Sequence, residues 1–529
     1  MDVDDVITAE MSTIGITPST PRNLLPGTRQ SRYTTSFRSS SKQHHLSPCP
    51  AQALAHTPPK SSWHPALTRS HHTLTVLSDA KAVIFGGQDS DGRLCPPAIH
   101  VITLPEDRHT QHTDDIEINI GVGSHHHALD QQQPAEDSER NEQQTGDGGN
   151  DYRTAHTCYP PFTLQDPSTG EVLVPAPRSG HATCARGGHR VLLHGGKGVV
   201  SEPVTEAREE EAGYKEDADQ TRELKPLTTD GNCIWQWNHN TLSWSKFPGD
   251  ITPLGQGEMK PRYGHWLFWG KDDRGLDDQL PASDEESKGE YLILVGGQTD
   301  SNRDEDAGVL KEVWLYEFDR GAWSPLPSAP APPVAAAFVN RTVYIISNNT
   351  PDKGSDTIST VHYLPLHRSA VEREKADALA WHTVSILPGS PSPRPRTGAY
   401  LAPIQIDNGR EYLIYLFGLA VSPSAKRWDF CPDVWAFQLP LHRRLSAATA
   451  AVKDKIKDVI PGEGSREFKW NEAEVVPAEL ITEEGKVHPG SRAFFGADSC
   501  LNGRGVVLWG GVNALGEREG DGWVLRVED

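Results

Sequence analysis

Residues 177–196 have the sequence PRSGHATCARGGHRVLLHGG, and the layout of this stretch identifies the class of fold. An Arg-x-Gly-His segment comes first, and a short apolar run that ends in a glycine pair follows it. In two places the first glycine comes 14 residues after the histidine, and in a third place an acidic insert lengthens the gap. A layout that recurs along one chain predicts a repeat protein. The histidines and glycine pairs are His72 with Gly86 and Gly87, His181 with Gly195 and Gly196, and His265 with Gly296 and Gly297.

Tryptophans follow the glycine pairs at a second fixed spacing, nine residues apart in two of the copies. Three further copies are degenerate, and the last of them contains Gly510 and Gly511, so the chain holds six. Apolar runs of five to seven residues rich in Val and Ile have the length and composition of β-strands. Glycine pairs permit positive φ at strand ends, and the tryptophans are large apolar plates that pack between sheets. These tryptophans are Trp235 with Trp244, Trp314 with Trp323, Trp435 and Trp523.

The repeat resembles the kelch-repeat β-propeller family over residues 61–529, and its long polar inserts are similar to those of fungal kelch and galactose-oxidase-like central-domain propellers. The resemblance implies an all-β, six-bladed kelch-type propeller, since one blade cannot bury its own faces and must stack on its neighbours. An all-β sandwich is the alternative. Trp63 lies in a segment similar to the second tryptophan strand of a repeat. We therefore expect residues 62–67 to complete the last blade and close the ring, which removes an exposed sheet edge.

Composition assigns the remaining segments and excludes several classes of function. Residues 1–60, rich in Ser, Thr, Pro and Arg, predict a disordered tail, with a targeting segment as the alternative. The chain has 51 Lys and Arg against 72 Asp and Glu, and its formal charge of −21 argues against nucleic-acid binding. No apolar stretch has the length of a transmembrane helix, so no membrane partner is expected. Seven widely spaced cysteines without a CxxC motif favour a reducing compartment, and hence a cytoplasmic location with the nucleus as the alternative.

Four inserts extend the repeats, at about 106–157, 200–230, 270–289 and 441–467. The first three are acidic and are expected to be solvated loops that carry much of the negative charge. The fourth contains residues 444–460, whose apolar positions have helical spacing. We expect a short amphipathic helix there, which either packs on the propeller or docks a partner.

The kelch resemblance also implies where a ligand binds. In that family the arginine of each copy often lies at the inner rim of the ligand-binding mouth, and the residues after the glycine pairs turn toward the same mouth. Guanidinium groups suit carboxylates and phosphates, so we predict an anionic ligand, either an acidic peptide or a small carboxylated molecule. The alternative is that these arginines hydrogen-bond backbone carbonyls between blades. By resemblance the mouth residues are Arg69, Arg178, Arg262, Arg396, Arg492, Gln88, Lys197 and Gln298.

The three repeat histidines are assigned to buried structural positions, because a catalytic base would be one residue and not three equivalents. The sequence has no GxSxG, HExxH or phosphate-binding loop, and we match no copper-ligand set of the galactose-oxidase type. We expect neither metal nor cofactor, and we assign His125, His126 and His127 to a polar loop.

We therefore predict a protein-interaction or scaffold module whose partner is a protein with acidic segments or a small anionic metabolite. Whether the chain is also an enzyme stays open. The alternative function is a cofactor-independent tailoring protein, cyclase-like or isomerase-like, in a fungal secondary-metabolite pathway. A deep pocket with a perturbed carboxylate would favour the alternative, whereas a wide face would favour peptide binding.

Overall fold

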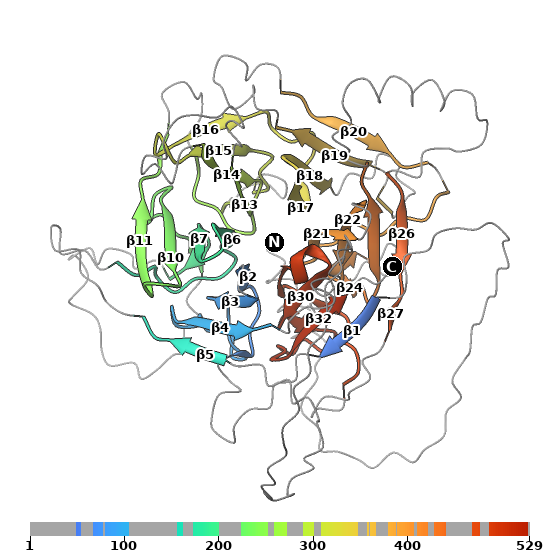
Figure 1. The fold of residues 1–529 in the computed structure, drawn as a ribbon, viewed down its shortest axis with the longest axis horizontal. Helices are drawn as coiled ribbons and strands as arrows, with labels where there is room; N and C mark the ends of the chain where they lie inside the picture. The colour runs from blue at the N-terminus through green and yellow to red at the C-terminus, as the bar shows by residue number, and fades with distance from the viewer. Residues whose placement is uncertain are drawn as a thin grey trace, which may run out of the picture.

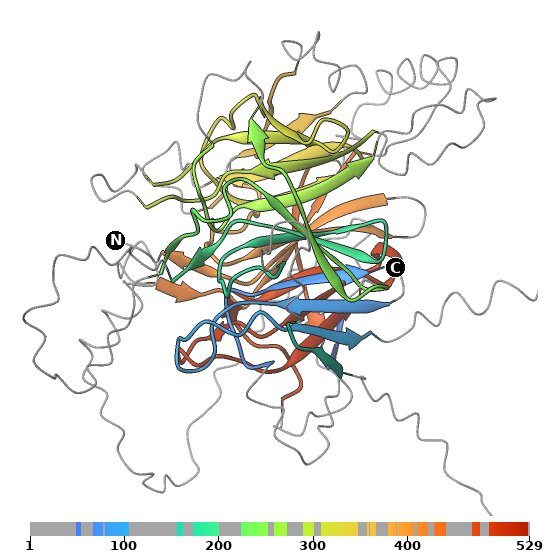
Figure 2. The same cartoon turned by 90° about the vertical axis from the view of Figure 1, so that its left-hand side faces the viewer.

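The computed structural model is a six-bladed β-propeller whose small antiparallel sheets stand in a ring around a central axis (Figure 1). Seen from the side, the sheets stack as layers that cross the molecule (Figure 2). Among the described residues, no helix is long and apolar enough to cross a membrane. The structure describes residues 49–53, 67–77, 80–104, 156–161, 173–199, 224–251, 259–271, 289–300, 308–347, 357–358, 360–366, 379–387, 389–406, 410–421, 428–440, 468–476 and 486–526.

Each blade is built from strands that follow the chain from the axis outward. Blade 1 contains β2 (Thr73–Leu77), β3 (Lys81–Phe85), β4 (Ile99–Thr103) and β5 (His156–Tyr159). Blade 2 contains β6 (Ala182–Arg186), β7 (Arg190–His194), β10 (Ile234–Asn238) and β11 (Ser243–Phe247). Blade 3 contains β13 (Trp266–Lys271), β14 (Glu290–Val295), β15 (Val313–Glu317) and β16 (Ala322–Leu326), and β12 (Asp250–Ile251) pairs with β16 in parallel.

The second half of the ring repeats this plan. Blade 4 contains β17 (Pro333–Val339), β18 (Thr342–Ser347), β19 (Thr360–Pro365) and β20 (His382–Ser385). Blade 5 contains β21 (Tyr400–Ile406), β22 (Arg410–Leu416), β25 (Val434–Gln438) and β26 (Trp470–Ala473). Blade 6 contains β29 (Gly496–Cys500), β30 (Gly505–Trp509) and β32 (Gly522–Arg526), with a short 3-10 helix at Leu501–Gly503. Three two-stranded ribbons join β8 (Lys197–Gly198) to β9 (Lys225–Pro226), β23 (Leu419–Val421) to β24 (Trp428–Phe430), and β28 (Arg492–Ala493) to β31 (Val512–Asn513).

An N-terminal strand closes the ring, as the sequence predicted, but it is not the strand that was expected. The closing strand is β1 (Cys49–Ala53), which pairs antiparallel with β32 and in turn pairs parallel with β27 (Val475–Val476) (Figure 1). It lies inside the segment predicted as a tail, and the expected residues 62–67 are described only at Leu67. A ladder of backbone hydrogen bonds needs no tryptophan, so the tryptophan pattern misplaced the strand. Trp63 lies outside the described residues, as do residues 1–48 and 444–460.

The hydrophobic core is divided into six clusters, each between two neighbouring blades. Strand β3 illustrates the arrangement, because Ala82 and Ile84 pack against blade 6 while Val83 and Phe85 pack against blade 2. A strand covered on both faces must be apolar at every position, which explains the uninterrupted apolar runs. The repeat tryptophans belong to these interfaces and are at most 8% exposed. Since every blade depends on both neighbours, the ring stands as one structural unit.

Candidate functional site on the glycine-pair face

All six innermost strands begin at the same end of the ring, which we name the glycine-pair face because the second strands end there. The loops from each second strand to its third strand emerge on this face, and so do the connections from one blade to the next. The face therefore collects every segment that the sequence assigned to a ligand-binding mouth, while the hairpin turns of the innermost strands lie at the opposite end.

The five predicted arginines lie on this face with their guanidinium groups turned into the blades. Each arginine is at most 2% exposed. In each, Nη1 donates a hydrogen bond to the carbonyl of the residue directly after the second strand of the same blade. The acceptors are Gly86 O for Arg69 (2.9 Å), Gly195 O for Arg178 (3.0 Å), Gly296 O for Arg262 (3.1 Å), Phe417 O for Arg396 (3.1 Å) and Gly510 O for Arg492 (3.0 Å).

Carboxylates accompany four of these arginines, and sequence reasoning missed them. The pairs are Arg178 with Asp230 (2.7 Å), Arg262 with Glu312 (2.6 Å), Arg396 with Asp433, and Arg492 with Asp521 (2.7 Å). In the fifth, Arg69 Nη2 lies 3.1 Å from His100 Nε2.

Three of the carboxylates stand two residues before a repeat tryptophan, as EVW, DVW or DGW, and accept a hydrogen bond from its indole N–H. This short motif was visible in the sequence. Burial alone would raise the pKa of Glu312 and Asp521, but the paired arginines and the indole hydrogen bonds outweigh it and hold each pKa below its usual value.

The backbone of four of these arginines links its blade to the one before it. The N–H of the second glycine of one blade donates to the carbonyl of the next blade's arginine, as in Gly87 N to Arg178 O at 2.8 Å and Gly196 N to Arg262 O at 2.9 Å. The alternative hypothesis was that the arginine side chains hydrogen-bond backbone carbonyls between blades. Their guanidinium groups do contact backbone carbonyls, but these carbonyls belong to the same blade as the arginine. Direct contact of these arginines with an anionic ligand stays a prediction.

The repeat histidines pack against the glycine pairs, and each is 5% exposed. A Cβ atom added to Gly86 would lie 2.6 Å from His181 Cε1, and one added to Gly195 would lie 2.7 Å from His265 Cε1. Glycine is therefore required where the histidine of the next blade approaches. Burial lowers the pKa of all three histidines well below the usual value, so they stay uncharged.

At the centre of the face, one residue from each of five blades adopts a left-handed backbone conformation. These residues are His71 (φ 54°), Gly180 (62°), Gly264 (62°), Gly398 (62°) and Phe494 (57°). They form a chain of four hydrogen bonds around the axis, in which the N–H groups of His71, Gly180, Gly264 and Phe494 donate to the central residue of the preceding blade at 2.7 to 2.9 Å. At blade 4, the degenerate copy whose innermost strand begins at Pro333, the described residues show no such bond.

The three predicted residues after the glycine pairs lie beside this central chain. Gln88, Lys197 and Gln298 form β-bridges to Ser70, Ser179 and Tyr263, the residues that follow three of the arginines. Lys197 is 8% exposed, and its ammonium group lies 3.8 Å from the centre of the Tyr263 ring. The glutamines are partly exposed, and the side chain of Gln88 accepts a hydrogen bond from Arg518.

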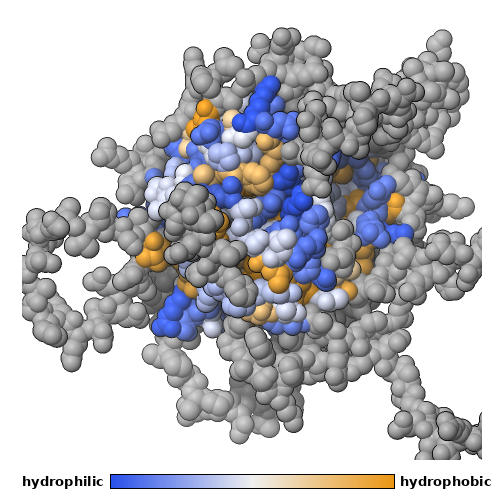
Figure 3. Space-filling view, turned by 60° about the vertical axis from the view of Figure 1, so that its left-hand side comes forward, coloured by the Kyte–Doolittle hydropathy of each residue, from blue (hydrophilic) through white to orange (hydrophobic). Residues whose placement is uncertain are grey.

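Exposed hydrophobic residues gather on this face. Among the described residues, five large hydrophobic side chains are between 37% and 72% exposed: Val199, Val309, Leu387, Val421 and Leu515. Four lie in loops between second and third strands, and Leu387 lies in the connection from blade 4 to blade 5. In one view of the surface, hydrophobic patches interrupt a largely hydrophilic exterior (Figure 3).

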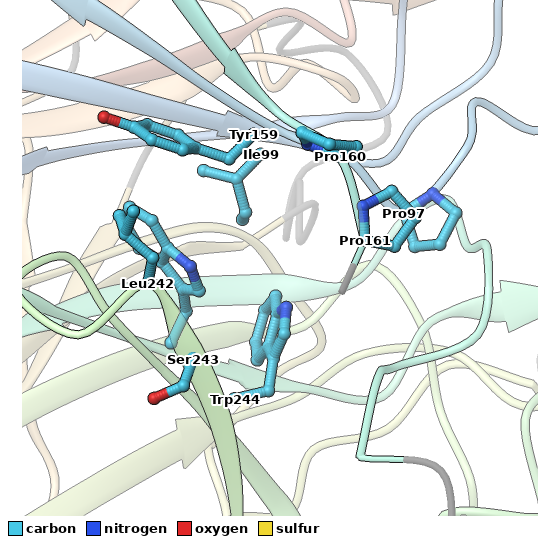
Figure 4. A pocket seen from close by; sticks show the side chains of 9 residues that line it. Pro97, Ile99, Tyr159, Pro160, Pro161, Leu242, Ser243 and Trp244 are labelled. Atoms are coloured by element: carbon cyan, nitrogen blue, oxygen red, sulfur yellow. The ribbon is translucent and has the colours of Figure 1, made fainter. Parts of the chain in front are cut away.

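A small pocket lies between the outer strands of blades 1 and 2. Tyr159 and Trp244 line it together with Trp237, Ile99 and three prolines (Figure 4). It offers few polar groups that could orient a substrate, so it lacks the character of a catalytic site. Within the described ranges, no cluster of three His, Cys, Asp or Glu side chains could hold a metal ion.

One titratable group near the axis stands apart from the repeat pattern. Asp498, on β29, is partly buried, and it accepts hydrogen bonds from the N–H groups of Val76 and Ser499, both at 2.8 Å. Burial raises its pKa to about 6 despite these bonds. Burial also raises the pKa values of Cys184 and Tyr400, on two other innermost strands, and the Asp498 charge adds to both shifts.

Comparisons with known proteins add little to this description. No family model matches the chain, and no curated protein matches it. A solved structure described as "Structure of YjhT" is similar over 90% of this chain and 97% of that one, at 13% identity and a TM-score of 0.44. We draw no argument from a similarity of this size. The kelch resemblance therefore stays a prediction, while the propeller itself follows from the sheets.

Proposed function

We propose that this propeller is a protein-interaction module that binds a partner across its glycine-pair face, and that the partner presents an acidic peptide there. The observation that carries the proposal is the position of the five exposed hydrophobic side chains, which come from several blades and share one face. Single exposed hydrophobic residues are common, but residues gathered on one face are typical of an interaction surface.

Acidic character of the partner is the finer part of the proposal. The buried arginines hold the strand ends in place, so a ligand would contact the more exposed groups of the same face, including the amides of Gln88 and Gln298 and the guanidinium of Arg518. These groups donate hydrogen bonds, which carboxylates accept well.

Fluorescence anisotropy with a set of labelled acidic peptides, each with one hydrophobic residue, tests the proposal. The full chain should bind members of this set, and the variant Val199→Ser, Val421→Ser, Leu515→Ser should bind them at least ten times more weakly. The matched control is Asn240→Ser, Thr241→Ser, Gln405→Ser, since these exposed residues lie at the opposite end of the ring. Failure of the native chain to bind any peptide, or equal weakening in the control, would refute the proposal.

A second candidate function, a cofactor-independent isomerase-like activity, is favoured by Asp498 alone. A carboxyl with a pKa of about 6 can exchange a proton near neutral pH, and Tyr400 carries a hydroxyl on a neighbouring blade. Solvent deuterium incorporation into small carboxylated metabolites would measure this activity. The candidate requires that Asp498→Asn abolish the exchange while the fold is kept, and exchange that persists in this variant would exclude Asp498 as the base.

A further inference from the structure

We propose that His71 and Phe494 form an aromatic platform that binds an aromatic side chain of the acidic peptide, while Arg518 binds a neighbouring carboxylate. The inference rests on the proposed function and names the groups that recognise the partner. It begins from a departure from the repeat. At the left-handed central position, three blades use glycine, whereas blades 6 and 1 use Phe494 and His71.

Glycine is the residue that this backbone conformation favours. A side chain at φ near 55° brings Cβ close to the following carbonyl, so both substitutions raise the energy of the folded chain. Strain of this kind is concentrated at functional sites, where the surrounding structure enforces it. Here the enforcing structure is the central chain of hydrogen bonds, in which His71 N donates to Phe494 O at 2.8 Å and Phe494 N donates to Gly398 O at 2.9 Å.

The two side chains are arranged as a stack. Their ring centroids lie 4.2 Å apart with an interplanar angle of 18°, and both residues are only partly buried. A Cβ atom on Gly398 would lie 2.8 Å from Phe494 Cδ1, so glycine in blade 5 makes room for the stack. A partly exposed pair of parallel rings at the axis presents aromatic surface on which a third ring can pack.

Arg518 brings a positive charge to the edge of this platform. It belongs to the loop between β30 and β32 and reaches across to blade 1, where Nε donates to Ser70 Oγ at 3.0 Å and Nη2 to Gln88 Oε1 at 3.2 Å. His71 Nδ1 lies 3.2 Å from the same Ser70 Oγ, so one hydroxyl connects the guanidinium to the imidazole.

The distance from Arg518 Nη1 to Ser90 O is 3.5 Å, which is the outer limit of a hydrogen bond. A carboxylate bound to Arg518 would make a shorter, charge-assisted bond. Stacked rings beside a cation match an aromatic residue next to an acidic one. A free aromatic carboxylate has the same chemistry, but the exposed hydrophobic residues on the surrounding loops favour a longer ligand that continues beyond the platform. The platform is therefore assigned to a peptide, and small aromatic acids serve as probes of it.

The test replaces both platform residues by the residue that the other blades use. His71→Gly with Phe494→Gly should leave the urea midpoint unchanged or higher, because the left-handed strain is relieved. The same variant should bind a peptide with an Asp-Tyr-Glu core at least ten times more weakly, measured by fluorescence anisotropy. Gly180→Ala, at the equivalent position of blade 2, is the control for changes in the central chain that leave the platform intact.

Three results would overturn the inference, and they are distinct from failure of the proposed function. In the first, the double glycine variant binds the peptide normally. In the second, this variant unfolds, which would make the stack structural. In the third, the native chain prefers Asp-Leu-Glu peptides to Asp-Tyr-Glu peptides. If the native chain binds no peptide, titration with phenylacetate and cyclohexylacetate, followed through the imidazole NMR signals of His71, decides between the ligand sources. Shifts with phenylacetate alone would support the platform with a small aromatic acid, and no shift with either probe would refute it.

Discussion

Replacing Arg492 by Met removes the charge of one repeat arginine while keeping most of its volume. Arg492 is completely buried, its Nη1 donates to Gly510 O at 3.0 Å, and it pairs with Asp521 at 2.7 Å. Breaking one side of a buried ion pair costs roughly 3–5 kcal/mol, since the partner charge is left without compensation. Lys486 Nζ remains 3.3 Å from Asp521 Oδ2 and supplies part of that compensation, so we expect a loss of about 3 kcal/mol.

Urea unfolding of the full chain, followed by tryptophan fluorescence, measures this loss as a lower midpoint. The variant with both Arg492→Met and Asp521→Asn should recover part of the stability, because the neutral amide no longer needs a cation. A coupling energy of at least about 1 kcal/mol between the two sites is expected for groups in direct contact. A loss below about 0.5 kcal/mol for Arg492→Met, or additive effects in the double variant, would refute the structural role of the arginines. Lost peptide binding with unchanged stability would instead support their predicted role at the mouth.

Three further predictions concern the glycine pairs, the closing strand and the axial carboxyl. Gly195→Ala should destabilise the chain by more than about 2 kcal/mol, because its Cβ would lie 2.6 Å from Arg262 O, whereas Gly187→Ala, with similar φ and nothing within 4 Å, should cost clearly less in the same urea assay. Deleting residues 49–53 should lower the melting temperature and promote aggregation by exposing β32, and an unchanged melting temperature would contradict closure by β1. The raised pKa of Asp498 means that its ionised form is disfavoured in the folded chain. The resulting loss of folding stability is absent below the unfolded pKa of 3.8 and complete above the folded pKa of about 6. Asp498→Asn should therefore be more stable than the native chain at pH 8 but not at pH 4.

The blade pattern was predictable from the sequence because the residues that specify it have demanding surroundings. A glycine pair such as Gly195 and Gly196 is needed where a histidine of the next blade packs against the backbone, and the tryptophans fill gaps between sheets. Both requirements recur at fixed spacing, so the copies align by eye. Strand β1 escaped prediction for the opposite reason, since its pairing with β32 uses the backbone and places no visible demand on residue type.

The surroundings of the arginines were predictable only in part. The kelch resemblance assigned Arg178 and Arg262 to a ligand-binding mouth, but it could not show that their guanidinium groups turn inward to Gly195 O and Gly296 O. The direction of each arginine side chain depends on where its hydrogen-bond acceptor and its paired carboxylate lie, and both belong to later parts of the blade. Asp433 and Asp521, each two residues before a tryptophan, carry that information, and a search for acids at this position would have found three of the four buried pairs, though not Arg178 with Asp230.

The positions of the motif have different structural roles, and this is why we proposed binding residues at positions that depart from the repeat. The arginine, and in three blades the histidine three residues later, is buried, so a change there is expected to cost stability. The next two positions contact neighbouring segments through their backbone, so the contacts do not depend on the residue type. In the five blades with the arginine, the first of these positions is Ser, Ser, Tyr, Thr or Ala. The second is Gly in three blades and His71 or Phe494 in the other two. Since glycine is the favoured residue at the second position, His71 and Phe494 are departures from the repeat, and the proposed recognition of a partner would account for them. Tyr263 is a further departure, since the other blades have small residues at its position, and its ring lies under the Lys197 ammonium group. In this propeller the repeated residues of each motif build the face, and the proposed binding residues are those that depart from the repeat.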